Sequence, residues 1–414
     1  MSANQTKYPQ LRFKGFTDPW EKRTLGQTTT KAKSYSLSRD VERDHETGYR
    51  YIHYGDIHTG VADIVTEHTK LPNIEPANYD ELRVNDLVVA DASEDYQGIA
   101  EPAVVVGLPT HLVAGLHTIT LRPSSASSLY LYYLLHTDSF KHFGYQMGTG
   151  LKVFGISWSN LSEFTFMIPS RPEQEMIVKL IESVDNLIAV NQRKLAKLKE
   201  LKQGYLQKMF PQNGSKFPQL RFAGFAYAWE KRKLGELANI RRGASPRPIK
   251  SKKWFSQTSQ VGWIRISDVT EQNGRIHQVE QHLSDAGQKK TLVLKSKHLL
   301  LSIAATVGKP VQNYIQVGVH DGFIVFMDPK FDLDFMFYFL EKYRPNWARF
   351  GQPGSQININ SELVRDLVVS IPTVHEQDAV AQFIITLDNL IAATQCKLDL
   401  LKKLKKGYLQ KMFC

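Results

Sequence analysis

The feature of this sequence that most constrains its fold is a tandem duplication. The segment KYPQLRFKGFTDPWEKRTLG at 7–26 returns as KFPQLRFAGFAYAWEKRKLG at 216–235, with identical residues at 14 of 20 positions. A second pair follows, because 168–210 returns at 371–413 and both copies end in GYLQKMF. The period is about half of the 414-residue chain. The repeat therefore indicates two copies of one large module and excludes a solenoid of short units.

The second repeated pair has the periodicity of a long helix. Its apolar residues recur at spacings of three and four over more than four heptads, with polar residues between them. Thirty such residues would span about 45 Å, and an apolar stripe of that length needs an equally long partner. We expect the two helices to pair as an antiparallel coiled coil, although each could instead pack only on its own domain. The stripe residues that we assign to pairing or partner binding are Ile177, Val184, Leu187, Asn191, Leu198, Tyr205, Phe383, Leu387, Leu390, Thr394, Leu401 and Tyr408, where the polar Asn191 and Thr394 could fix the register.

The stretches between the repeats differ in sequence but share an order of local patterns. YIHYGDI at 51–57 answers WIRISDV at 263–269, and each stretch later contains a β-branched run and then an aromatic patch typical of a helix. We therefore predict two similar α+β domains related by an internal pseudo-twofold duplication. The predicted organisation is a first domain at 1–167 with its repeated segment at 7–27, a central helical region at 168–215, a second domain at 216–370 with its repeated segment at 216–236, and a C-terminal helical region at 371–414.

Charge and cysteine content narrow the class of protein. A formal charge of +11 and a pI near 9.3 favour a polyanionic partner, of which nucleic acid is the leading candidate. The two cysteines, Cys396 and Cys414, exclude a disulfide framework and a cysteine-based zinc site. The first residues lack an apolar signal core, and no run approaches the ~18 consecutive apolar residues of a membrane span. We expect a cytoplasmic protein.

Motifs for catalysis are missing from the sequence. It contains no G-x-x-x-x-G-K-[ST] and no Asn-Pro-Pro-aromatic tetrapeptide, and GTGLKVFG at 148–155 lacks dinucleotide-binding spacing. HYGDIH at 53–58 could suggest a metal, but in a strand its two histidines would point to opposite faces. Glu200 and Lys202 lie on the predicted helix, where solvated charges explain them better than a nuclease site. The sequence points away from an enzyme.

Two similar but divergent modules on a basic chain suit a DNA target made of two unlike half-sites. The paired PQLRF-GF…WEKR and EQ…LDNLI…GYLQKMF segments resemble those of type I restriction-modification specificity subunits, over nearly the whole chain. The resemblance implies a non-catalytic DNA-binding subunit that acts in phage defence and DNA methylation and reads a bipartite asymmetric target. It also implies docking of two adenine-methylating modification subunits and two motor-nuclease restriction subunits. S-adenosylmethionine, ATP and Mg²⁺ would then be bound by the partners and not by this chain.

Basic and amide side chains in the two domains are the candidates for DNA contact. The second domain offers IRRGASPRPIKSKKW at 240–254, which its Gly and Pro residues mark as a loop, and the matching stretch of the first domain at 28–44 is sparser. Two Gly-turn segments, at 148–154 and 351–360, add one candidate each. The full set is Arg241, Arg242, Arg247, Lys250, Lys252, Lys253, Lys31, Lys33, Arg39, Arg43, Lys152 and Gln356.

Other interpretations remain open on the sequence alone. The chain could be a single-chain DNA methyltransferase or nuclease with an unrecognised site, or a coiled-coil adaptor whose two domains bind proteins. The lysines of the long helices are typical of a solvated coiled-coil face. The WEKR segments could serve as scaffolding or dock a modification subunit.

Overall fold

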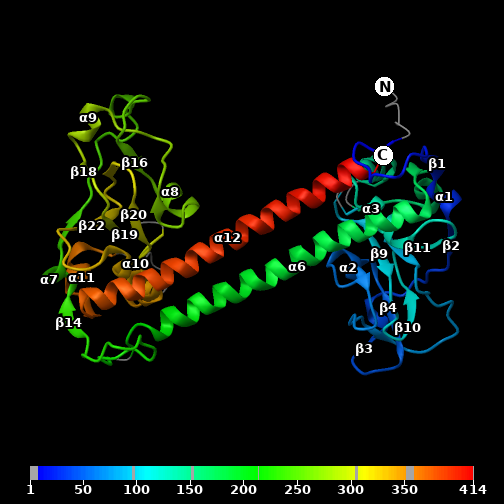
Figure 1. The fold of residues 1–414 in the computed structure, drawn as a ribbon, viewed down its shortest axis with the longest axis horizontal. Coiled ribbons are helices and arrows are strands. Elements are labelled where there is room, and N and C mark those ends of the chain that lie inside the picture. The colour runs from blue at the N-terminus through cyan, green and yellow to red at the C-terminus, as the bar shows by residue number, and fades with distance from the viewer. Residues whose placement is uncertain are drawn as a thin grey trace. The chain divides into compact units, whose positions relative to one another are not determined.

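The computed structural model describes residues 8–95, 98–150, 153–212, 214–303, 306–350 and 359–413. The chain divides into two compact units, of which unit 1 comprises 1–192 and 396–414 and unit 2 comprises 193–395. Each unit contains one α+β domain together with part of each of two long helices, α6 and α12 (Figure 1). The expected fold class, two similar α+β domains separated by long helices, is confirmed.

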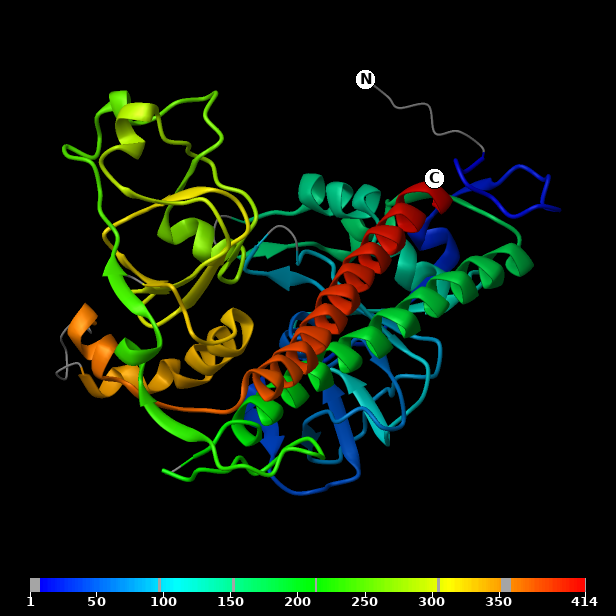
Figure 2. The same cartoon turned by 60° about the vertical axis from the view of Figure 1, so that its left-hand side comes forward.

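Unit 1 is built on a five-stranded sheet with the order β2-β11-β7-β9-β5. Its strands are drawn in blue and cyan in Figure 2. Its pairs are antiparallel except β5 with β9, which is parallel. Strands β7 and β9 are buried throughout because their side chains are almost all aliphatic, as a strand covered on both faces requires. The strands are β2 (Thr29–Ala32), β5 (Ile64–Val65), β7 (Leu87–Ala90), β9 (Pro102–Val105) and β11 (Thr118–Pro123).

Smaller elements complete unit 1. A four-stranded sheet has the order β10-β4-β6-β3, and two-stranded pairs form between β1 and β13 and between β12 and β8. These strands are β1 (Glu21–Thr24), β3 (Glu42–Arg43), β4 (Tyr49–Ile52), β6 (Asn73–Ile74), β8 (Ala92–Ser93), β10 (His111–Ala114), β12 (Phe154–Gly155) and β13 (Thr165–Ile168). The helices are α1 (Leu25–Thr28), α2 (Tyr54–His58), α3 (Ser128–Leu135), α4 (Asp138–Met147), α5 (Trp158–Ser162) and the 3-10 turn η1 (Arg39–Val41).

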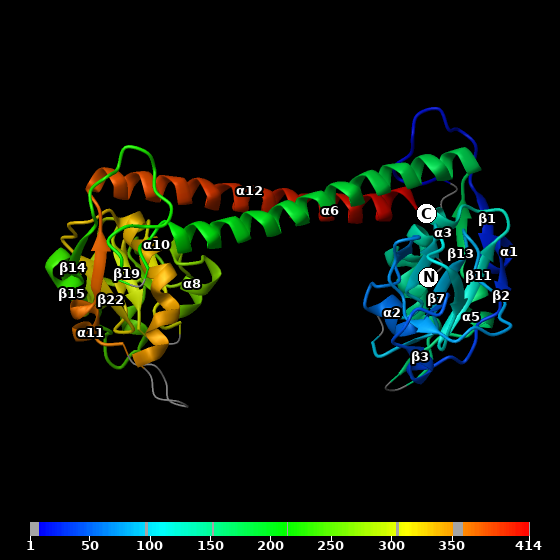
Figure 3. The same cartoon turned by 90° about the horizontal axis from the view of Figure 1, so that it is seen from below.

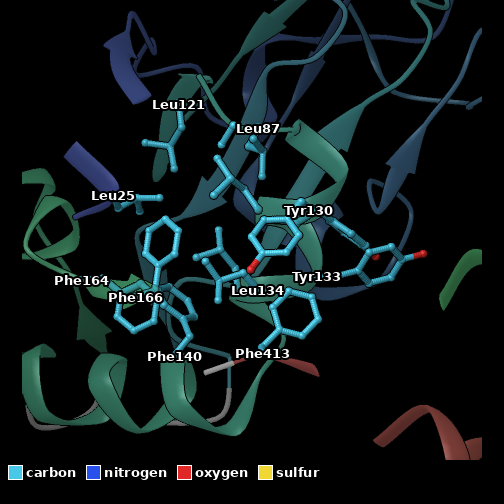
Figure 4. Packing of buried hydrophobic residues seen from close by; sticks show 14 of the residues in the cluster. Leu25, Leu87, Leu121, Tyr130, Tyr133, Leu134, Phe140, Phe164, Phe166 and Phe413 are labelled. Carbon is cyan, nitrogen blue, oxygen red and sulfur yellow. The ribbon is translucent and has the colours of Figure 1, made fainter. Parts of the chain in front are cut away.

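The main core of unit 1 joins its sheet to the long helices. Helix α3, the predicted aromatic helix, buries seven of its eight residues. Figure 4 shows its Tyr130 and Leu134 among Leu87 and Leu121 of the sheet, with Phe413 from the end of the chain beside Tyr130. The Tyr130 and Phe413 rings stack with centroids 5.0 Å apart. The domain is thus packed directly onto the end of α12.

Unit 2 repeats the architecture of unit 1. Its five-stranded sheet has the order β15-β22-β19-β20-β17, in which each strand corresponds to the strand at the same place in unit 1. A three-stranded sheet, β16-β21-β18, and the pair β14-β23 accompany it. The strands are β14 (Glu230–Lys233), β15 (Asn239–Arg242), β16 (Gly262–Ile264), β17 (Arg275–Ile276), β18 (Leu292–Leu294), β19 (Leu299–Ser302), β20 (Pro310–Asn313), β21 (Val317–Val319), β22 (Phe323–Met327) and β23 (Val368–Ile371).

The short helices of unit 2 also correspond to those of unit 1. Helix α10 takes the place of α3 as the aromatic helix, and Figure 3 shows it beside α6 and α12. The helical elements are α7 (Leu234–Leu237), η2 (Lys252–Trp254), α8 (Ile266–Glu271), α9 (Asp285–Gln288), α10 (Leu333–Tyr343), η3 (Arg344–Phe350) and α11 (Ser361–Asp366).

The long helices are α6 (Arg171–Lys208) and α12 (Val374–Met412), and they pair in antiparallel fashion within each unit. In unit 1 the core contains Ile177 and Ile181 near the start of α6 together with Met412 at the end of α12. In unit 2 the end of α6 lies beside the start of α12, since the ring centroids of Tyr205 and Phe383 are 4.8 Å apart. By length and composition α12 could cross a membrane. This is weak evidence for a membrane protein, because the core helix of a globular protein has the same length and composition.

The buried stripe on these helices differs in part from the predicted one. Asn191 and Thr394 are buried as expected, but each side chain hydrogen-bonds the carbonyl four residues earlier in its own helix, at 2.6 and 2.7 Å. Leu187 and Leu390 are 47% and 44% exposed, so they lie outside the seam. The reason is helical phase. The side of α6 that faces the partner helix carries the buried residues 181, 184, 191 and 195 and the half-buried residue 188, and Leu187 lies off this line.

Two local predictions are wrong. HYGDIH is not a strand, because the chain leaves β4 and enters α2 at Tyr54, where Asp56 accepts a hydrogen bond from the His53 amide at 2.9 Å and caps the helix. The stretch from Ile240 is not entirely a loop, because Arg241 and Arg242 belong to β15 and pair with β22. Strand pairing at this sheet edge outweighs the low strand propensity of a charged pair.

Candidate nucleic-acid interface

The basic stretch of unit 2 begins on a strand at the edge of the sheet and continues over its surface. Arg241 and Arg242 lie on β15, and Arg247 and Lys250 follow in the connection that leads to η2. Lys252 and Lys253 lie on η2 itself. All six side chains belong to exposed residues. The structure therefore presents six cations on one continuous surface stretch, as phosphate contact requires.

Some of these cations have partners inside unit 2. Arg242 donates to the Asp321 carbonyl at 2.8 Å, and Arg247 forms an ion pair with the Asp321 carboxylate at 2.8 Å. Burial opposes ionisation of Asp321, but a hydrogen bond from Ser245 and the nearby cations outweigh it and lower the pKa of Asp321. This carboxylate thus fixes the start of the basic stretch in place.

The other cations are free to meet an anion. Within the described residues, Arg241, Lys250 and Lys252 form no ion pair, whereas Lys253 lies over the Trp254 ring at 4.3 Å. Lys250 and Lys252 stand beside a cavity of about 520 Å³ that Trp263, Phe255 and His320 also line. Burial lowers the pKa of His320, which favours its neutral form. The cavity therefore combines an aromatic wall with a cationic rim, a combination suited to nucleic acid.

In unit 1 the corresponding cations are mostly neutralised. Lys31 is on β2, and Lys33 approaches Asp80 at 3.8 Å. Arg39 forms ion pairs with Asp56 at 2.8 Å and Glu42 at 2.7 Å, and these two acids overcome its burial and raise the pKa of Arg39.

Arg43 forms an ion pair with Glu75 at 2.9 Å. Arg39 and Arg43 are therefore held by ion pairs within unit 1. Among the candidate cations that the structure describes, more are without an ion pair in unit 2 than in unit 1. The candidates Lys152 and Gln356 lie outside the described residues.

The repeated segments outside this surface build a buried anchor in each unit, which the sequence did not reveal. In unit 1 the Arg12 guanidinium donates two hydrogen bonds to Glu173, at 2.7 and 2.8 Å, and the Trp20 indole donates a third at 3.2 Å. In unit 2 Arg221 and Trp229 meet Glu376 in the same way. The available signal was that all three sets of positions are repeated, the PQLRF and WEKR positions after 209 residues and the Glu-Gln positions after 203.

The glutamine after each buried glutamate holds the aromatic helix. Gln174 accepts a hydrogen bond from the Ser127 amide at the start of α3 at 2.8 Å, and Gln377 accepts one from the Asp332 amide at the start of α10 at 2.8 Å. The PQLRF segments also reach the ends of the long helices, where the Leu11 amide donates to Lys411 and the Leu220 amide donates to Lys208, each at 2.9 Å. These bonds satisfy helix-end carbonyls that lack partners within the helix.

Two of the helix lysines are not solvated as expected. Lys202 forms an ion pair with Asp388 at 2.7 Å, and Lys405 forms one with Asp185 at 2.7 Å. The two lysines occupy equivalent positions in the repeat, where the helical spacing would place an apolar residue. Both are half-buried, so their methylene groups pack between the helices while their ammonium groups bind carboxylates.

Comparison with known proteins decides the family. The model of the type I restriction modification DNA specificity domain matches residues 17–200 and again residues 227–403. The chain belongs to the type I restriction-modification specificity family. Two copies of the domain in one chain agree with the duplicated sheet order and with the resemblance found in the sequence.

Relatives of similar length support the assignment of this chain as a specificity subunit. The chain is 21% identical over 416 residues to the MjaVIII type I restriction enzyme specificity subunit of Methanocaldococcus jannaschii, covering 94% of this chain and 91% of the relative. It is 23% identical over 368 residues to a specificity subunit assigned to the MjaX enzyme of the same organism, covering 84% and 83%.

Solved structures of low identity show the same fold. The S subunit from M. genitalium aligns with a TM-score of 0.57 and 15% identity over 98% of this specificity subunit and 99% of that chain. The HsdS subunit from Thermoanaerobacter tengcongensis aligns with a TM-score of 0.52 and 18% identity, covering 95% and 96%. As a specificity subunit the chain is the non-catalytic component of its system, with two recognition domains.

Proposed function

We propose that this specificity subunit reads a bipartite, asymmetric DNA target with one half-site per recognition domain. The observation that carries the proposal is that the two units share one fold but carry different side chains on their surfaces. The sheet order is the same in both units, but Arg241, Lys250 and Lys252 offer free charge in unit 2, whereas Arg39 and Arg43 are ion-paired in unit 1. Different side chains on one scaffold read different bases. The recognition domains span 1–167 and 216–370, and they alternate with the helical regions 168–215 and 371–414.

The chain also docks two modification subunits and two restriction subunits in this proposal. Exposed leucines on the long helices support it, because they recur at equivalent positions. Leu187 and Leu404 belong to unit 1 and are 47% and 40% exposed, and their counterparts Leu390 and Leu201 belong to unit 2 and are 44% and 38% exposed. A repeated apolar position on a solvent face suits two copies of one partner.

The division of chemistry follows from this assignment. S-adenosylmethionine would be bound by the modification subunits, and ATP and Mg²⁺ by the restriction subunits. Among the described residues no group of three or more His, Cys, Asp or Glu side chains is arranged to hold a metal ion. The assembled complex would act in the cytoplasm, where the host DNA lies.

Methylation mapping of the host genome tests the proposal. In a strain that carries the partner subunits, the gene for this chain should produce one methylated motif with two separated, unlike half-sites. Deletion of the gene should remove that motif and leave other methylation unchanged. A contiguous motif, or a bipartite motif that persists after deletion, would contradict the proposal.

A further inference from the structure

Each unit contains a three-residue contact between its recognition domain and both long helices. In unit 1 the Tyr133 hydroxyl on α3 donates to Asp185 Oδ2 on α6 at 3.0 Å, and Lys405 Nζ on α12 meets Asp185 Oδ1 at 2.7 Å. The Lys405 ammonium also lies 5.5 Å from the centre of the Tyr133 ring. In Figure 4 Tyr133 lies at the edge of the hydrophobic cluster with its hydroxyl pointing away from the cluster.

Unit 2 contains the same contact with the roles of the long helices exchanged. The Tyr338 hydroxyl on α10 donates to Asp388 Oδ2 on α12 at 2.7 Å, and Lys202 Nζ on α6 meets Asp388 Oδ1 at 2.7 Å. The Lys202 ammonium lies 5.4 Å from the centre of the Tyr338 ring. The aspartates and the lysines are each 203 residues apart, which is the offset of the helical repeat. We call these two contacts the Tyr-Asp-Lys triads.

The surroundings of the triads restrict the movement of their side chains. Tyr133 and Tyr338 are buried, so neither phenol can turn to water without leaving the core. Each aspartate uses one oxygen for the tyrosine and the other for the lysine, and the lysine holds the carboxylate in place from the other long helix. A rotation of the domain on the helices would therefore break the hydrogen bond from the tyrosine and the contact of its ring with the ammonium group.

In unit 2 the Tyr338 hydroxyl additionally accepts a hydrogen bond from Arg275 at 2.9 Å, and Arg275 forms an ion pair with Asp334 at 2.9 Å. Arg275 lies on β17, at the edge of the main sheet. The triad of unit 2 is therefore connected by hydrogen bonds to the recognition sheet itself.

We propose that Tyr133 and Tyr338 are positioning residues that hold each recognition domain at one orientation on the paired helices and thereby restrict the target to one gap between half-sites. The proposal rests on the proposed bipartite reading. It differs from a role in stability, because the hydrophobic contacts of α3 and α10 with the long helices remain when the phenol oxygen is removed.

Tyrosine-to-phenylalanine variants test this role. Tyr133→Phe and Tyr338→Phe would each be expressed with the modification subunit, and the methylated motifs would be mapped by sequencing. The matched control is Tyr132→Phe, because Tyr132 is the adjacent residue on α3 and its hydroxyl bonds Asp63 within the recognition domain. We expect both positioning variants to keep the two half-sites but to methylate sites whose gap is one base pair longer or shorter at least about tenfold more often, since a charge-assisted hydrogen bond is removed. The control should keep a single gap.

The other outcomes are also informative. A single unchanged gap in both positioning variants would overturn the inference, and so would their failure to fold when Tyr132→Phe folds, because the hydroxyls would then hold the fold and not the orientation. Lys405→Met offers a second measurement, since it removes the ion pair but leaves the phenol bond, and it should relax the gap in the same direction. Absence of any bipartite motif with the wild-type chain would instead contradict the proposed function.

Discussion

Glu173 and Glu376 are buried carboxylates near the first turn of the long helices, where a helix N-terminus favours negative charge. Each accepts two hydrogen bonds from an arginine of the PQLRF segment and one from a tryptophan of the WEKR segment. One carboxylate thus ties the repeated PQLRF…WEKR segment to a helix that begins about 150 residues later in the sequence. These hydrogen bonds explain why the arginine, the tryptophan and the glutamate occur in both repeats. The tryptophan therefore has a structural role.

The anchor gives a prediction about stability. Glu173→Gln should lower the free energy of unfolding by about 3 kcal/mol, because it leaves the Arg12 cation without its buried carboxylate. The control is Glu175→Gln, two residues along α6, where the ion pair with Arg171 is more than half exposed and should contribute less than about 1 kcal/mol. Urea unfolding of the purified variants measures both changes. Equal effects of the two substitutions would contradict the anchor.

At the scale of elements, the basic stretch of β15 to η2 carries the most accessible positive charge among the candidate cations. Replacement of Arg241, Lys250 and Lys252 by alanine should weaken DNA binding and reduce the slope of log K against log salt by ~0.9 for each phosphate that the protein no longer neutralises. The replacement Lys199→Ala, at an exposed position on α6, serves as the control and should change the slope less. Fluorescence anisotropy over a series of salt concentrations measures the slope. If the triple variant keeps the wild-type slope, the stretch faces away from DNA.

The sequence predicted elements better than contacts. Periodicity predicted both long helices, because one residue in three or four reports burial along the whole element. The two aromatic helices were predicted from their aromatic composition, since α3 is buried on nearly every side. The strand at Arg241 was missed because its pairing with β22 depends on residues more than eighty positions away. The triads were missed for a similar reason, since Lys202 and Lys405 look like solvated lysines until a carboxylate and a phenol from other helices are brought to them.

At the scale of the whole molecule, the continuity of the long helices predicts that they set the gap between half-sites. Insertion of four residues near Lys199 would lengthen α6 by ~6 Å and roughly keep the apolar stripe in phase, since four residues are a little over one turn. At ~3.4 Å per base pair this corresponds to one or two additional bases in the gap. The half-sites should not change.

An insertion of two residues at the same place serves as the control. It would rotate the stripe by about 200° and should impair helix pairing and assembly. Mapping of the methylated motif in cells that express each variant with the modification subunit measures both effects. An active four-residue variant with the original gap would show that the helices do not determine it.

The central claim is that each recognition domain reads its own half-site, and exchange of one domain tests it most directly. Residues 28–167 would be replaced by the corresponding stretch of a related specificity subunit, with the buried anchor and the long helices left unchanged. The methylated motif of the chimera would be mapped in cells that express the modification subunit. We predict that one half-site changes to that of the donor, while the other half-site stays as it was. A chimera that alters both half-sites, or neither, would contradict the account.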